Sequence, residues 1–128
     1  MSDIKKTIMV VDDDAALRKL YNVELSTKGF NVVEAADGKE ALSRIETEHP
    51  DLILLDLVMA NLDGVGLLTE MKNHDDWKGI PVIMLTNFGQ ENLVKQAYDL
   101  GVSDFLLKYK VTQEEMAQKI SQTLSGGA

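Results

Sequence analysis

Four short apolar runs, each ending at a polar residue, constrain the fold of this chain more than any other feature. They read IMVVDDD (8–14), LILLD (52–56), VIMLT (82–86) and FLLK (105–108). Uninterrupted Val, Ile, Leu and Met runs of about four residues are too short for ordinary helices and are typical of parallel strands buried on both faces. In an open parallel sheet, ligands bind outside the carboxyl ends of the strands. We therefore expect one edge of the sheet to gather the polar residues that end these runs, namely Asp12, Asp13, Asp56, Thr86 and Lys108.

Amphipathic patterns alternate with these runs about every 25 residues, which predicts βαβ units. Five helices are expected, over about 15–28, 38–49, 64–73, 90–99 and 112–124. The last should begin with a capping box, TQEE, at Thr112. The first should turn an apolar face to the core, formed by Leu17, Leu20, Tyr21 and Leu25. The segment 30–35 is shorter and more polar than the other runs, as an edge strand would be. Right-handed crossovers then predict a doubly wound α/β fold with a five-stranded parallel sheet, in a single domain over 1–128.

Composition excludes several kinds of site. The chain has no cysteine, so disulfides, thiolate metal sites and cysteine nucleophiles are excluded. Its 21 acidic and 13 basic residues give a net charge of −8, which is unsuited to binding a nucleic-acid backbone. No apolar run approaches the roughly 20 residues that span a bilayer, and MSDIKK lacks the apolar core of a signal peptide. We expect a cytoplasmic protein without nucleic-acid or membrane partners and without an output domain.

Carboxylates from separate strand ends would favour a divalent cation. Two like charges 4 Å apart repel by about 4 kcal/mol at an effective dielectric near 20, so such a cluster holds a proton or recruits a cation. Oxygen-only ligands favour Mg²⁺ (or Mn²⁺), which completes its shell with water and phosphate oxygens. Asp56 could then form an acyl phosphate, with Thr86 and Lys108 holding the phosphoryl oxygens. Each residue also has an ordinary structural use; Asp13 or Asp14, for example, could cap the first helix.

These residues carry a family resemblance. The segments VVDDD, DLILLDLVMANLDG, PVIMLT and DFLLK resemble the acid pair, phosphoacceptor segment, switch threonine and lysine of receiver domains of two-component response regulators. The resemblance covers nearly the whole chain and implies a flavodoxin-like fold with strand order 2-1-3-4-5. It implies that Asp56 accepts a phosphoryl group from a sensor histidine kinase or a phosphotransfer protein. It also implies a metal site of Asp12, Asp13, Asp56 and the backbone carbonyl of Val58, with Asp12 acting through water.

The same resemblance implies a switch pair, Thr86 and Phe105, in which the hydroxyl moves toward the phosphate and the ring follows inward. In the family this shift remodels the face formed by the fourth helix, the fifth strand and the fifth helix. Candidates on that face here include Val94, Tyr98, Phe105 and Lys108. The implied function is a stand-alone signalling protein, rather than an enzyme, that assists its own phosphorylation and dephosphorylation. It would be a monomer or a phosphorylation-dependent dimer.

Two departures from the family pattern lie in loops beside the predicted site. Ala60 stands where the family has a proline, so this loop has lost a φ constraint. Asn87, followed by Phe88, stands where the family has a small residue after the switch threonine. We expect this bulk to narrow the approach of water to the phosphate and to slow its loss.

A third departure follows the predicted lysine. Tyr109 stands where the family has a proline that is commonly in a cis bond. A non-proline cis bond costs about 2.5–4 kcal/mol. We therefore expect a trans Lys108–Tyr109 bond and a reshaped loop, in which Lys110 could compete for the role of Lys108.

Three other functions stay open. A haloacid-dehalogenase-type phosphohydrolase would use the Asp-x-Asp pattern at Asp12 and Asp14, although Ala16 departs from that family and the chain has no room for a cap domain. A flavodoxin-like electron carrier would need a Ser-, Thr- or Gly-rich phosphate loop where this chain has three aspartates. A receiver-shaped interaction module that is never phosphorylated is the third, since the three departures are compatible with it.

Overall fold

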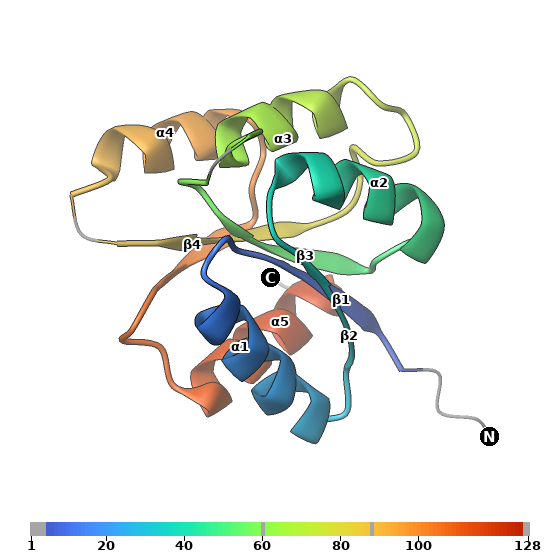
Figure 1. Ribbon diagram of the computed structural model, residues 1–128, viewed down its shortest axis with the longest axis vertical. Helices are drawn as coiled ribbons and strands as arrows, with labels where there is room; N and C mark the ends of the chain where they lie inside the picture. Colours follow the sequence, from blue (N-terminus) through green and yellow to red (C-terminus); the bar gives the residue numbers. More distant parts are fainter. Residues whose placement is uncertain (1–4, 60, 88, 127–128) are drawn as a thin grey trace.

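The computed structural model describes residues 5–59, 61–87 and 89–126, and within these ranges five parallel strands form one sheet flanked by five helices (Figure 1). The strands are β1 (Thr7–Val11), β2 (Asn31–Ala35), β3 (Leu52–Asp56), β4 (Val82–Thr86) and β5 (Asp104–Leu107). The helices are α1 (Ala15–Thr27), α2 (Gly38–Glu48), α3 (Gly64–Lys72), α4 (Glu91–Asp99) and α5 (Gln113–Leu124). The strand order β2-β1-β3-β4-β5 confirms the predicted flavodoxin-like fold. The predictions for Ala60 and Phe88 lie outside the described residues.

Two layers of helices bury the sheet. Helices α2, α3 and α4 cover one face, and α1 and α5 cover the other (Figure 1). Every residue of β3 and of β4 is buried, which explains their continuous apolar sequences. The polar segment β2 lies at one edge of the sheet, as expected, and β5 lies at the other. The sheet thus separates two apolar clusters, one built around Met9, Ile53 and Met84 and the other around Ile8, Leu54 and Ile83.

Strand register brings the predicted polar residues to one edge. In the β1–β3 pair Val11 lies opposite Leu55, so Asp12 follows β1 at the level where β3 ends with Asp56. In the β4–β5 pair Thr86 lies opposite Leu107, the residue before Lys108. All of these strand ends point to the left in Figure 1. The carboxyl edge of the sheet is therefore where functional chemistry is expected.

Four of the five described helices begin with a side-chain cap. The carboxylates of Asp14, Asp37 and Asp63 accept hydrogen bonds from the first turns of α1, α2 and α3. Thr112 and Glu115 form the predicted capping box of α5. Each such cap satisfies an otherwise unpaired backbone N–H at a helix start.

One predicted core position is wrong. Leu20 is 49% exposed, whereas Leu17, Tyr21 and Leu25 are buried. These three residues are spaced four apart and define the buried stripe of α1, and Leu20 lies beside this stripe on the solvent side. Among the described residues, no helix combines the length and apolar character needed to cross a membrane.

Candidate functional site

Three carboxylates converge at the carboxyl edge of the sheet. Asp12 and Asp13 follow β1, Asp56 ends β3, and one oxygen of each lies within 4.8 Å of the others. Asp12 and Asp56 are buried, with 0% and 5% exposure, while Asp13 is exposed. The site is therefore closed on one side and open to solvent at Asp13. This all-oxygen donor set fits Mg²⁺, which is held by one or two carboxylates and keeps several waters.

Backbone and side-chain contacts fix Asp12 from several directions. Its N–H donates to the carbonyl of Ala35 at 3.1 Å, and its Oδ1 accepts from the N–H of Asp14 at 2.9 Å. Its carbonyl accepts from Nη1 of Arg18 at 2.7 Å, and Nε of Arg18 donates to Glu34 at 2.8 Å. Arg18, which sequence reasoning missed, therefore ties the first turn of α1 to the acidic loop.

Lys108 completes the cluster. Its Nζ lies 3.0 Å from Oδ2 of Asp12 and 3.3 Å from Oδ2 of Asp56. Burial disfavours the charged ammonium, but hydrogen bonds and attraction from the two carboxylates outweigh burial and raise the pKa of Lys108. Lys110, the other candidate, lines a separate hollow between β5 and α5. The structure thus brings Lys108 to the acids, where its charge offsets part of theirs.

The ionisation of Asp56 reflects this crowded site. Burial, followed by repulsion from Asp12, raises the pKa of Asp56 to about 6. Attraction to Lys108 and a hydrogen bond from the N–H of Val58 to Oδ1, at 3.2 Å, oppose this increase but do not cancel it. A carboxylate held under repulsion gains from any added positive charge. The electrostatics therefore favour a cation beside Asp56.

A glycine lets α3 begin directly against the Asp56 segment. A Cβ at Gly64 would lie 2.7 Å from the Cα of Leu57 and 2.9 Å from the carbonyl oxygen of Asp56. The N–H of Gly64 donates to the carbonyl of Leu57 at 3.0 Å. A side chain at this position would force either the backbone at Asp56 and Leu57 or the start of α3 to shift, so Gly64 contributes to the site through close backbone approach.

Thr86 and Phe105 lie on either side of a partly apolar cavity. Thr86 is buried at the end of β4, and its hydroxyl donates to Oε1 of Gln90 at 2.8 Å. Phe105 is 39% exposed on β5. The cavity between them has a volume of about 200 Å³ and is lined by Thr86, Asn87, Gln90, Glu91, Val94, Phe105 and Leu107. Gln90 did not emerge from the sequence because glutamine is not among the preferred residues at a helix start.

The loop after Lys108 has an unusual backbone. Throughout the described chain no peptide bond is cis, which confirms the trans prediction for Lys108–Tyr109. Tyr109 has φ of 65°, a left-handed conformation that L-residues rarely adopt. Its ring centroid lies 5.9 Å from Nζ of Lys108, and its side chain is 70% exposed. The loop turns through a left-handed residue at Tyr109, and Lys108 reaches the acids.

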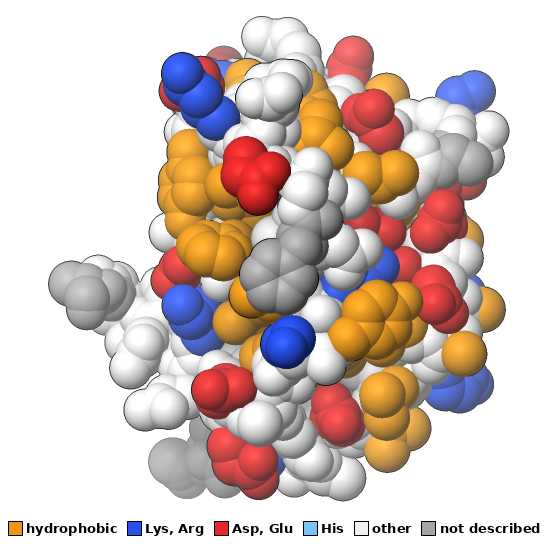
Figure 2. All heavy atoms as spheres, turned by 90° about the vertical axis from the view of Figure 1, so that its left-hand side faces the viewer, with side chains coloured by type: hydrophobic (Ala, Val, Ile, Leu, Met, Phe, Trp, Pro, Cys, Tyr) orange, Lys and Arg blue, Asp and Glu red, His pale blue; other side chains and the backbone are white. Residues whose placement is uncertain are grey.

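The surface around the strand ends is chemically mixed. Figure 2 shows this side of the molecule, where acidic side chains lie beside hydrophobic ones. Two large exposed hydrophobic residues, Val58 and Tyr109, each lie two residues beyond the end of a strand, β3 and β5 respectively.

Comparisons with known proteins agree with this geometry. A family profile described as "Response regulator receiver domain" matches residues 8–121. A protein named "Probable transcriptional regulator ycf27" from Porphyridium aerugineum is 38% identical over 120 residues, which are 94% of this chain and 48% of that protein. The alkaline phosphatase synthesis transcriptional regulatory protein PhoP of Bacillus subtilis is 35% identical over 105 residues, which are 82% of this chain and 46% of that protein. The chain thus matches less than half the length of these curated relatives.

Solved structures show the same similarity. A CheY-like response regulator receiver domain protein from Methanospirillum hungatei aligns with a TM-score of 0.86 and 28% identity, covering 96% of both chains. The receiver domain of NtrX from Brucella abortus aligns with a TM-score of 0.83 and 30% identity, covering 92% of this chain and 98% of that one. With the family profile extending over most of the sequence, this chain belongs to the response regulator receiver domain family of two-component systems.

Proposed function

We propose that the chain accepts a phosphoryl group on Asp56 from a phosphohistidine of a sensor histidine kinase or a phosphotransfer protein. The supporting observation is the convergence of Asp12, Asp13 and Asp56 within 4.8 Å, with Lys108 beside them. Receiver domains bind Mg²⁺ at such an acidic pocket. Here Asp12, Asp13, Asp56 and the carbonyl of Val58 would hold the ion, with Asp12 contributing through water. The ion, Mg²⁺ or Mn²⁺, would supply positive charge that offsets repulsion between the carboxylates and the incoming phosphoryl group.

The proposed step transfers a phosphoryl group from nitrogen to oxygen. A carboxylate oxygen of Asp56 attacks phosphorus, the bond between phosphorus and the histidine nitrogen breaks, and that nitrogen keeps the electron pair. An acyl phosphate forms on Asp56. Lys108 and the hydroxyl of Thr86 would bind the phosphoryl oxygens. The chain acts here as phosphoacceptor and assists the reaction, and hydrolysis of the acyl phosphate returns it to its starting state.

Thr86 and Phe105 would transmit the effect of phosphorylation from Asp56 to the protein surface. Once the hydroxyl of Thr86 turns toward the phosphoryl group, the cavity of about 200 Å³ beside it can receive the ring of Phe105. A cavity of about 150 Å³ is known to hold a benzene ring, so this volume is sufficient. Inward movement of Phe105 would change the face formed by α4, β5 and α5, on which Val94, Tyr98 and the Lys108 end of β5 also lie.

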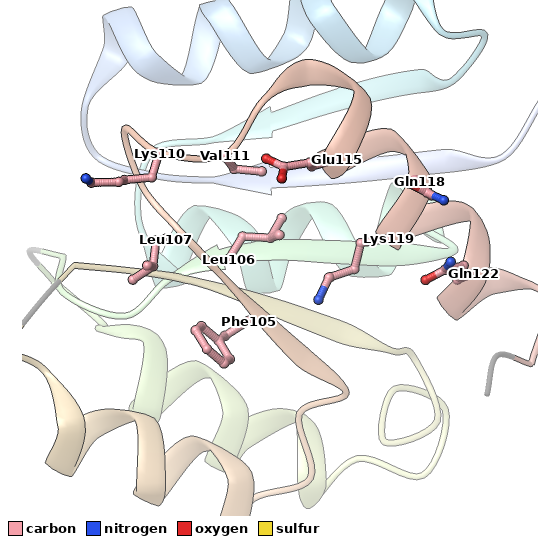
Figure 3. A pocket seen from close by; sticks show the side chains of 9 residues that line it. All are labelled: Phe105, Leu106, Leu107, Lys110, Val111, Glu115, Gln118, Lys119 and Gln122. Carbon is pink, nitrogen blue, oxygen red and sulfur yellow. The ribbon is translucent and has the colours of Figure 1, made fainter.

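This face already has a hollow of about 460 Å³ between β5 and α5 (Figure 3). Leu106 belongs to the cluster with Met116 and Ile120 of α5, whereas Phe105 alternates to the other side of β5, toward α4. The hollow is lined by Phe105, Leu106, Leu107, Lys110, Val111, Glu115, Gln118, Lys119 and Gln122. A shift of Phe105 therefore alters both sides of a surface that could bind a partner or a second copy of the chain.

Phosphorylation of the purified chain is the direct test. Treatment with acetyl phosphate and Mg²⁺ should add the mass of one phosphoryl group, detected by intact-mass spectrometry. The Asp56→Asn variant should show no addition, and chelation of the metal should suppress the addition in the wild type. An unmodified wild-type chain would favour the alternative of a receiver-shaped interaction module. Continuous turnover of a phosphomonoester would instead favour a phosphohydrolase.

The location and partners of the chain extend this proposal. We propose that the chain lies in the cytoplasm and itself binds no nucleic acid, and its net charge of −8 supports the second point. The size of the protein in extracts of its source, measured with an antibody to this chain, tests whether an output domain is attached. Light scattering with and without a phosphoryl mimic tests whether the chain stays monomeric or dimerises through the α4-β5-α5 face.

A further inference from the structure

The residue just before α4 uses its side chain differently from the residues that cap the other helices. Gln90 occupies the cap position of α4, yet its side chain accepts no hydrogen bond from the helix it precedes. Instead, its Oε1 accepts from the hydroxyl of Thr86 at 2.8 Å and from the N–H of Asn87 at 3.0 Å. One amide oxygen thus links the end of β4 to the start of α4.

This contact competes with the role proposed for Thr86. A threonine hydroxyl has a single proton to donate. In the structure this proton is directed to Gln90, with the carbonyl of Asn87 a second acceptor at 3.3 Å. To donate to a phosphoryl oxygen on Asp56, the Thr86 hydroxyl has to break its hydrogen bond to Gln90. The contact therefore favours the unphosphorylated arrangement.

We propose that Gln90 is a positioning residue that holds the Thr86 hydroxyl in the unphosphorylated state and couples its release to movement of α4. This inference rests on the proposed phosphorylation of Asp56. It assigns to Gln90 a restraining role: the residue opposes activation and does not contact the reacting atoms.

The packing of α4 makes such coupling effective. Ala97 is the one fully buried residue among the described positions of α4, while α3 buries Gly64, Leu67, Leu68 and Met71. A helix with few buried contacts can be displaced at low cost. Gln90 also lines the cavity beside Phe105. Release of Gln90 would therefore free the start of α4 and one wall of the cavity together.

Equilibrium binding of beryllofluoride with Mg²⁺, a stable mimic of a phosphoryl group, measures the restraint. The Gln90→Leu variant removes the acceptor oxygen and keeps most of the side-chain volume. A typical hydrogen bond contributes about 1 kcal/mol, so its loss should tighten beryllofluoride binding about fivefold. The Gln96→Leu variant makes the same replacement at an exposed position of α4 and should bind like the wild type. Unchanged affinity in Gln90→Leu would overturn the inference.

A second pair of variants shows whether the effect acts through Thr86. In a Thr86→Val background the hydroxyl is absent, so adding Gln90→Leu should change beryllofluoride affinity far less than it does in the wild type. An equal gain in both backgrounds would mean that Gln90 acts on the packing of α4 without Thr86, and it would also overturn the inference.

Amide hydrogen exchange separates this inference from the function on which it rests. In the unphosphorylated protein, the N–H of Asn87 should exchange faster in Gln90→Leu than in the wild type, because its acceptor is lost. A wild type that fails to bind beryllofluoride refutes the proposed function, even where this exchange result is obtained. A wild type that binds it, with neither affinity nor exchange altered in Gln90→Leu, refutes only the role of Gln90.

Discussion

Replacing Asp56 by asparagine should make the protein more stable at neutral pH, although it removes the proposed reactive group. Asp56 is buried beside Asp12, and its pKa is raised from the ordinary value of 3.8 to about 6. The folded protein therefore binds a proton at Asp56 more tightly than the unfolded chain does. The free energy of unfolding therefore falls as the pH rises from about 3.8 to about 6, and it stays level at higher pH. Asparagine, which carries no charge, avoids this loss.

The gain in stability from Asp56→Asn follows from the difference between the ordinary pKa of Asp56 and its raised pKa in the folded protein. Each pH unit between them corresponds to about 1.4 kcal/mol, so Asp56→Asn should gain about 3 kcal/mol near pH 8. Near pH 4.5, where the carboxyl is largely protonated in the folded protein, the gain should shrink to about 1 kcal/mol. The interaction with Lys108 is already contained in the pKa of Asp56, so it is not an additional loss.

Urea denaturation in the presence of a chelator measures both gains. The exposed Asp76→Asn variant removes the same charge from the surface and should stay within about 0.5 kcal/mol of the wild type at either pH. Equal stability of Asp56→Asn and wild type near pH 8, or an equal gain at both pH values, would refute the account of a carboxylate under repulsion.

Three further outcomes are expected. Mg²⁺ affinity, measured by calorimetry, should weaken by up to about tenfold for each pH unit below 6, because a proton on Asp56 competes with the ion; an affinity independent of pH would contradict the proposed ligand set. Tyr109→Pro should destabilise the protein by about 1–3 kcal/mol in urea, because proline fixes φ near −65° where the chain has 65°, while Tyr109→Gly should stay within about 1 kcal/mol. A proline variant as stable as the wild type would show that the loop adapts freely. The Asn87→Ala variant should lose its phosphoryl group faster than the wild type, as measured by intact-mass spectrometry over time. A rate no higher than that of the wild type would contradict the prediction that Asn87 limits the approach of water to the phosphoryl group.

The sheet and the acidic cluster could be predicted because both depend on local pattern and simple topology. Continuous apolar runs such as 52–56 and 82–86 fit only strands buried on both faces, as β3 and β4 are. Parallel strands end at one edge, so Asp12, which follows β1, and Asp56, which ends β3, had to be neighbours once β1 and β3 were adjacent. The positions of these carboxylates did not depend on details of any loop.

The geometry of the loops and the partners of individual side chains could not be predicted from the sequence in the same way. The left-handed backbone of Tyr109 depends on how the chain turns from β5 into α5, and tyrosine gives no local signal for it. The contact of Gln90 with Thr86 depends on the direction in which the β4–α4 loop leaves the sheet. The exposure of Leu20 depends on how far the apolar stripe of α1 extends around the helix. Each is set by tertiary arrangement, which residue spacing does not encode.

The reach of Lys108 across the sheet has a mechanical consequence. Lys108 follows β5, a strand at the rim, yet its ammonium contacts Asp12, which follows β1 near the centre. A strand at the edge of the sheet has one hydrogen-bonded neighbour, whereas β3 and β4 each have two, so fewer backbone hydrogen bonds oppose displacement of β5. New negative charge at Asp56 would change the forces on this ammonium, and hence on the strand that also carries Phe105. The edge of the sheet would thus respond to an event near its centre.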